Sequence, residues 1–152
     1  MTSSMAEISP RQLVVWRMLQ RAQAQITRGL ETDLLSGHDL APAAYDVLQT
    51  LAGSPDRRLR MNDLADRVLL SRSGLTRLID RLQREGLVER AACPSDARGL
   101  FAVLTDSGEN RLSEATPTYL RAIQREFLDV LGEEELRQCA AMLAKLFATG
   151  AR

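Results

Sequence analysis

Apolar side chains recur at spacings of three and four over a long stretch at each end of the chain, the strongest sequence signal for an amphipathic helix. The first stripe follows Ser9-Pro10, a pair suited to a helix start. It consists of Val15, Leu19, Ala22, Ile26, Leu30 and Leu34. The stripe predicts a helix of about 25 residues that ends at Gly37-His38-Asp39.

The C-terminal third is predicted to be helical throughout. Thr105 is a suitable cap for a helix whose apolar face is Leu112, Ala115, Tyr119, Ile123, Phe127 and Val130. The stripe keeps its phase past Thr116-Pro117, so this proline is expected to kink the helix rather than end it. Gly132 precedes a last helix, which begins at Glu133-Glu134-Glu135 and carries Leu136, Ala140, Leu143 and Phe147.

These stripes are longer than a compact central domain of about 70 residues can cover. The simplest solution is a homodimer in which the terminal helices of two chains bury one another. A monomeric bundle that folds its own two ends together is the alternative.

Short helices and a hairpin are predicted between the two stripes. The helices span about residues 42–53, 63–68 and 72–85, the second capped by Asn62 and the third by Ser71. Gly86 occupies the position where a left-handed residue usually ends a helix. Strands are predicted at 87–90 and 100–104, joined by a loop at 91–99.

The chain carries 20 basic and 20 acidic residues, so its net charge is zero. Residues 57–98, however, contain ten arginines and six acidic residues, a net charge of +4 that leaves −4 for the rest. A basic centre on a helix–turn–helix is typical of a surface that binds nucleic-acid phosphates. A GC-rich genome would also favour arginine, so the position of the charges matters more than their number.

The predicted helix at 72–85 has two different faces. Its buried stripe is Leu75, Leu78, Ile79 and Leu82. The opposite face carries Arg72, Ser73, Thr76, Arg77, Arg81 and Arg84. The small residues near the helix N-terminus allow close approach to DNA, and arginine reaches guanine or phosphate.

Residues 61–67 (MNDLADR) and 71–90 (SRSGLTRLIDRLQREGLVER) together resemble the winged helix–turn–helix of the MarR transcriptional regulators. The resemblance continues in the Asp-x-Arg pattern of Asp96 and Arg98 and covers about residues 10–148. It implies a mainly α fold with a small β-wing. A winged helix–turn–helix at 37–105 is flanked by long dimerisation helices at 10–36 and 106–149, after a flexible N-terminus at 1–9.

The family resemblance implies a homodimeric regulator, usually a repressor, that binds a pseudo-palindromic operator in double-stranded DNA. The recognition helix enters the major groove and the wing reaches the adjacent minor groove, where Arg98 is suited to A·T-rich DNA. Asp96 is expected to hold Arg98 or Arg90 in position. The residues expected to contact DNA are Arg60, Asn62, Ser71, Arg72, Ser73, Thr76, Arg77, Arg81, Arg90, Asp96 and Arg98.

Many members of the family release DNA when a small aromatic or anionic effector binds. Trp16, Arg17, His38 and Tyr45 are the candidate pocket residues, with ordinary packing as the alternative. Cys93, in the wing, is a candidate redox switch, which requires an accessible thiol; an incidental loop cysteine is the alternative. Cys139 is interpreted as a packing residue.

Several other classes of protein are not supported. No apolar run approaches the roughly 20 residues of a membrane span, and no secretory signal is visible, so a cytoplasmic location is expected. One histidine and no CxxC motif disfavour a metal site, and nothing indicates an enzyme or a cofactor. A winged-helix module that binds protein instead of DNA remains the alternative function.

Overall fold

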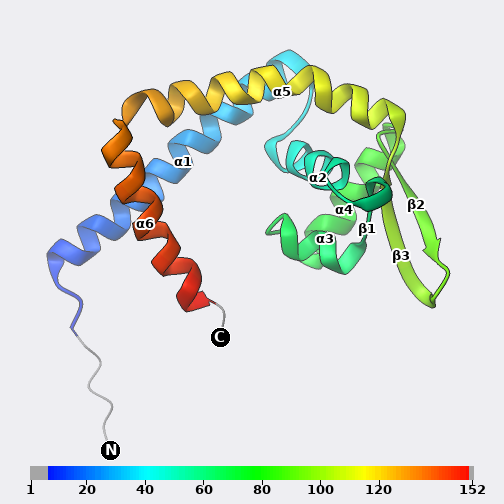
Figure 1. Cartoon of the computed structure of the whole chain (residues 1–152), viewed down its shortest axis with the longest axis horizontal. Helices are drawn as coiled ribbons and strands as arrows, with labels where there is room; N and C mark the ends of the chain where they lie inside the picture. Colours follow the sequence, from blue (N-terminus) through cyan, green and yellow to red (C-terminus); the bar gives the residue numbers. More distant parts are fainter. Residues whose placement is uncertain (1–6, 151–152) are drawn as a thin grey trace, which may run out of the picture. The chain divides into compact units, whose positions relative to one another are not determined.

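The computed structural model describes residues 7–150, apart from the side chains of residues 96–98 and 149–150. Its contacts divide the chain into two compact units (Figure 1). The first contains the residues up to Leu30 and those from Ala122 onward, and the second is Glu31–Arg121. Residues 1–6 of the predicted flexible N-terminus lie outside the described part.

The long helices begin where the sequence predicts, and the first of them also ends within the predicted break at Gly37-His38-Asp39. Helix α1 (Pro10–His38) continues through Gly37, and the chain leaves it at Asp39, whose φ is 49°. Helix α5 (Asp106–Glu126) continues through Pro117, as expected. The prediction that α5 extends to Val130 is wrong, because Phe127 has a non-helical backbone and Leu128–Val130 forms the short 3₁₀ helix η2. Helix α6 follows at Glu133–Gly150.

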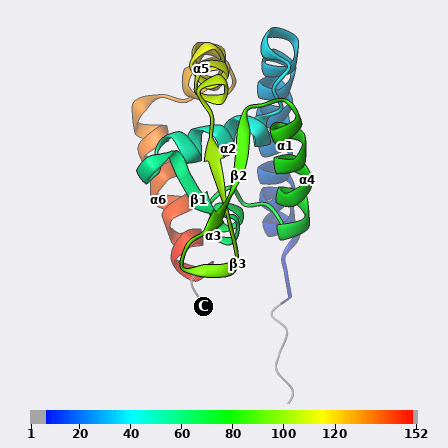
Figure 2. The same cartoon turned by 90° about the vertical axis from the view of Figure 1, so that its right-hand side faces the viewer.

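Besides the end of α1 and most of α5, the second unit contains three short helices, one 3₁₀ helix and three strands. These elements are α2 (Pro42–Ala52), the 3₁₀ helix η1 (Pro55–Arg57), β1 (Arg58–Arg60), α3 (Met61–Arg67), α4 (Arg72–Arg84), β2 (Val88–Cys93) and β3 (Asp96–Leu104). The sheet is antiparallel with the order β1-β3-β2. Helix α4 lies beside the β2–β3 hairpin (Figure 2).

One aliphatic core holds the second unit together. Side chains from α2, α3, α4, the sheet and the adjoining parts of α1 and α5 meet in it, and Leu48, Leu64, Ile79 and Val88 are fully buried. Burying one such side chain contributes about 1.5–3 kcal/mol. The core therefore fixes how α3 and α4 lie against the sheet.

The strands of the wing are longer than the sequence predicts. The predicted loop at 91–99 is mostly strand, because Ala91 pairs with Phe101 and Ala92 with Leu100 before a bulge at Ala92/Cys93. Strand β1 was not predicted: it has three residues, too few for a periodic signal, and it is held by pairing with β3. The wing hairpin thus belongs to a three-stranded sheet, with β3 in the centre, and is not a separate two-stranded ribbon.

Of the caps predicted at Asn62, Ser71 and Thr105, the last two are confirmed. The Ser71 Oγ accepts a hydrogen bond from Gly74 N at 3.1 Å, and the Thr105 Oγ1 accepts one from Gly108 N at 3.0 Å. Asn62 does not cap α3, because that helix already begins at Met61 and makes no side-chain cap bond. The predicted helix end is also confirmed: Gly86, just after α4, has a φ of 74°.

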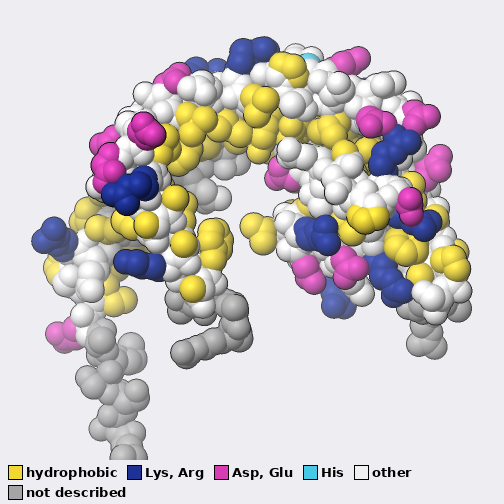
Figure 3. Space-filling view, viewed as in Figure 1, with side chains coloured by type: hydrophobic (Ala, Val, Ile, Leu, Met, Phe, Trp, Pro, Cys, Tyr) yellow, Lys and Arg dark blue, Asp and Glu magenta, His cyan; other side chains and the backbone are white. Residues whose placement is uncertain are grey.

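The terminal helices expose much apolar surface. In α1, Val15, Trp16 and Met18 are 61%, 55% and 63% exposed, and in α6 Phe147 is 76% exposed. Figure 3 shows apolar side chains gathered over the first unit, to which α6 and most of α1 belong. Within residues 7–150, no helix combines the length and the apolar character that crossing a membrane requires.

Gly108 of α5 lies close to Leu87 and Leu104, at the base of the wing. An added Cβ would lie 2.1 Å from the Leu87 carbonyl oxygen and 2.6 Å from Leu104 Cδ1. We expect Gly108→Ala to lower the free energy of unfolding by about 1–3 kcal/mol, measured by urea denaturation. Gly37→Ala is the control: nothing lies within 4 Å of its added Cβ, so a change below about 1 kcal/mol is expected. Equal stabilities would contradict this packing.

Candidate nucleic-acid interface

The polar face of α4 is presented to solvent by the burial of its apolar face. Leu75, Ile79 and Leu82 are at most 1% exposed. The predicted reading residues Ser71, Arg72, Ser73, Thr76 and Arg77 all lie exposed. Among the described residues, the side chains of Arg72 and Arg77 form no ion pair. Both guanidinium groups are therefore available for an external anion.

Arg81 differs from these two arginines. Its Nε donates a hydrogen bond to Glu85 Oε1 at 2.8 Å, and this contact raises the pKa of Arg81 above its ordinary value. Part of its positive charge is thus compensated on its own helix. Arg81 is exposed, but it offers less net charge to DNA than Arg72 or Arg77.

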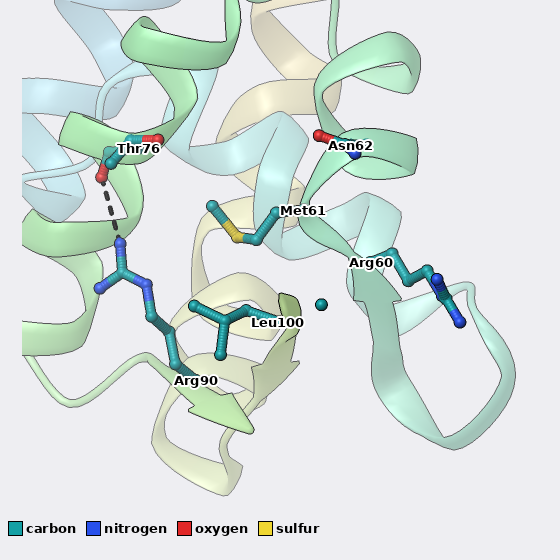
Figure 4. Close-up of a pocket in the computed structure, with 7 residues that line it drawn as sticks. Arg60, Met61, Asn62, Thr76, Arg90 and Leu100 are labelled. Carbon is teal, nitrogen blue, oxygen red and sulfur yellow. Dashed lines mark hydrogen bonds between the residues drawn. The ribbon is translucent and has the colours of Figure 1, made fainter. Parts of the chain in front are cut away.

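A hollow of about 440 Å³ separates α4, the start of α3 and the wing. It brings together four of the predicted contact residues: Arg60, Asn62, Thr76 and Arg90 (Figure 4). Met61, Gly99 and Leu100 also line it and were not predicted. Their apolar or small side chains carry no charge signal, and only the folded sheet brings them next to α4.

Arg90 joins the wing to the recognition helix. Its Nη2 lies 2.6 Å from Asp80 Oδ1, and its Nη1 donates to Gln83 Oε1 at 2.7 Å. A longer bond of 3.5 Å reaches the Thr76 carbonyl oxygen (Figure 4). Among the described side chains, Arg90 is thus tethered to Asp80, and the expectation that Asp96 holds Arg98 or Arg90 stays a prediction. The side chains of Asp96 and Arg98 lie outside the described part of the structure.

Arg60 reaches the tip of the wing. Its Nη2 donates to Ser95 Oγ at 3.1 Å, and its guanidinium lies 6.0 Å from the centre of the Phe101 ring. The Arg58 guanidinium lies over the same ring at 5.1 Å. Cation–π attraction thus holds two arginines on one face of β1. This arrangement has no signal in the sequence, because the pairing of β1 with β3 creates it.

Cys93 lacks the accessibility that a redox sensor needs. It is 5% exposed, and its Sγ lies 3.2 Å from Ser95 Oγ. Reactive cysteines are partly exposed thiolates in electropositive surroundings. The burial of Cys93 therefore favours a structural role in the wing.

The four candidate effector residues fall in different units. Tyr45 is buried, stacks on Tyr119 with ring centres 4.1 Å apart, and hydrogen-bonds to Thr116 Oγ1 at 3.1 Å. His38 Nε2 hydrogen-bonds to Thr118 Oγ1 at 2.9 Å.

Burial of Tyr119 is the main cause of its raised pKa, and the nearby Asp46 and Tyr45 raise this pKa further. Burial also raises the pKa of Asp46. Trp16 and Arg17 belong to the first unit. A pocket formed by Trp16, Arg17, His38 and Tyr45 remains a prediction.

Comparison with known proteins identifies the family of this fold. A model of the MarR family matches residues 38–99. The transcriptional regulator MhqR of Bacillus subtilis is 30% identical over 139 residues, which cover 91% of this chain and 93% of MhqR. The chain belongs to the MarR family.

Solved structures of MarR regulators have the same fold over nearly the whole chain. Sco3205 of Streptomyces coelicolor, solved in complex with DNA, superposes with a TM-score of 0.90 at 31% identity and covers 99% of this chain and 94% of its own. AbsC from the same organism gives 0.87 at 32% identity, with coverage of 95% and 97%. This MarR protein is therefore a DNA-binding transcriptional regulator, and its relatives are regulators rather than enzymes.

The tether between Asp80 and Arg90 can be tested separately from folding. We expect Asp80→Ala to lower the affinity for a selected DNA duplex on the order of tenfold, because Arg90 and the wing lose their fixed position. The melting temperature should change little, since the pair is partly exposed and such pairs contribute about 1 kcal/mol or less. Fluorescence anisotropy and thermal melting measure the two effects.

Glu85→Ala is the matched control, because it removes the other ion pair of α4, the one with Arg81. It frees a cation for DNA, so unchanged or higher affinity is expected. An Asp80→Ala protein that binds as tightly as Glu85→Ala would show that the tether does not position the wing.

Proposed function

We propose that the chain is a cytoplasmic, homodimeric repressor that binds a pseudo-palindromic operator and releases it when a small effector binds. The observation that carries the DNA-binding part is the exposed face of α4, where Arg72 and Arg77 form no ion pair with any side chain that the structure describes. Sco3205, at 31% identity, has been solved with DNA. The repressor MdtR of Bacillus subtilis, 29% identical over 135 residues, supports the direction of regulation.

In this proposal the N-terminal turn of α4 enters the major groove. Ser71, Ser73 and Thr76 are small enough for close approach, and Arg72 and Arg77 bind guanine or phosphate. Arg60 and Asn62 contact the phosphate backbone from the start of α3. Arg98 enters the neighbouring minor groove, whose negative potential favours arginine.

The homodimer is supported by the apolar surface of the terminal helices. Val15, Trp16 and Met18 of α1 and Leu146 and Phe147 of α6 are all more than half exposed in the single chain. Contiguous apolar surface of this kind marks protein–protein contact. A second copy of the chain is the partner we propose for it.

The proposed effector is a small aromatic or anionic compound. Tyr119, which is half-buried and stacks on the buried Tyr45, supplies the aromatic surface that such sites commonly use. His38, Trp16 and Arg17 remain the other candidate contacts.

Selection of random DNA duplexes tests the central proposal. We expect the parent protein to enrich a palindromic site, with affinity that falls steeply as salt rises, because bound arginines release counterions. The double variant Arg72→Ala/Arg98→Ala should bind that site at least about tenfold more weakly. Arg137→Ala, on α6 and paired with Glu134, is the control and should bind like the parent.

Retained affinity in the double variant would show that the assigned surface is wrong. Failure of the parent to enrich any palindrome would favour the alternative of a protein-binding winged-helix module.

Light scattering after gel filtration tests the homodimer. Phe147→Glu places a charge on the exposed apolar face of α6, so we expect a shift toward monomer and a loss of operator affinity. Gln138→Glu adds the same charge at an exposed position of the same helix and should leave the dimer intact. A parent protein that runs as a monomer would refute the proposed assembly.

A further inference from the structure

The turn between α3 and α4 exposes a leucine that the core does not use. Leu69 is 90% exposed, more than any other large apolar side chain in the described part of the chain. Its neighbours Val68 and Leu70 pack against the core. Leu69 also belongs to the second unit, so the apolar surface of the terminal helices does not account for it.

The backbone at Leu69 is unfavourable for leucine. Its φ is 55°, in the left-handed region that glycine adopts most readily. The chain needs this conformation, because Val68 N bonds to Leu64 O and Leu70 N bonds to Ala65 O to close the end of α3. Glycine or asparagine is the usual residue at such a helix end. Leucine is therefore disfavoured here both by its backbone conformation and by its exposure to water.

Leu69 lies at the edge of the proposed DNA-reading surface. It comes two positions before Ser71, whose hydroxyl caps α4. The residues that follow, Arg72 and Ser73, are exposed and polar. In helix–turn–helix proteins the N-terminal end of the second helix contacts base edges, so the preceding turn lies at the mouth of the major groove.

An apolar side chain at this place has one chemical match on a base pair. The thymine C5-methyl group is the apolar feature that the major groove displays, and apolar side chains recognise it. We propose that Leu69 is a specificity-determining residue that packs against a thymine methyl group in each half of the operator. This inference rests on the proposed DNA-binding function and adds a base preference to it.

Replacing thymine by deoxyuridine removes that methyl group and nothing else. The experiment takes the duplex selected by the parent protein and substitutes each thymine pair, one symmetric position at a time. We expect one position at which the parent loses about three- to fivefold in affinity, the effect of one buried methyl group.

Variants of Leu69 assign that loss to the side chain. Leu69→Asn accepts the left-handed backbone without an apolar group, so it should bind the thymine and deoxyuridine duplexes equally. Leu69→Met keeps an apolar side chain and should retain the discrimination. Thermal melting is expected to show Leu69→Asn at least as stable as the parent, which separates the effect from misfolding.

The outcomes are distinct. A parent that discriminates at no thymine, or a Leu69→Asn protein that discriminates as the parent does, overturns the assignment of Leu69 while leaving DNA binding intact. A parent that selects no duplex at all overturns the proposed function and this inference with it.

Discussion

Burial of one side of α4 is the constraint on which the interface depends. Leu75, Ile79 and Leu82 are at most 1% exposed, and each step along a helix turns the chain by about 100°. Rotating α4 by one residue would place an arginine in the core and a leucine in solvent, at a cost of several kcal/mol. Burial of the apolar face therefore directs Arg72 and Arg77 toward solvent.

The wing is held in position by a polar contact rather than by the apolar core. Arg90 on β2 bonds to Asp80 and Gln83 on α4, so the hairpin follows the recognition helix if that helix shifts. Such a partly exposed pair adds little stability, but it defines a position. The zero net charge of the chain conceals this basic region, because the net charge of +4 in residues 57–98 is cancelled by the net charge of −4 in the rest of the sequence.

Periodicity and capping were enough to predict most of the helices. The stripe of α4, its Ser71 cap and the left-handed Gly86 are local signals, and the structure has all three. Strand β1 and the extended wing were missed because their hydrogen bonds join residues more than forty positions apart or depend on a bulge. The Asp80–Arg90 tether and the burial of Cys93 were missed for the same reason: they exist only once the hairpin has returned to α4.

In the proposed homodimer, the exposed apolar surface of the terminal helices and the DNA-reading surface of α4 both serve selective binding to an operator. One recognition helix offers a few base contacts, each contributing about 1–3 kcal/mol of discrimination, whereas a genome presents roughly a million or more competing sites. A second recognition helix at a fixed spacing adds its base discrimination to that of the first, provided that the two DNA-binding units are rigidly joined. The apolar surface of α1 and α6 can provide that connection, because its exposure to water is unfavourable in a single chain and it becomes buried between the two chains of a dimer. Residues of α1 and α6 that make no base contact would therefore set how selectively the protein binds its operator.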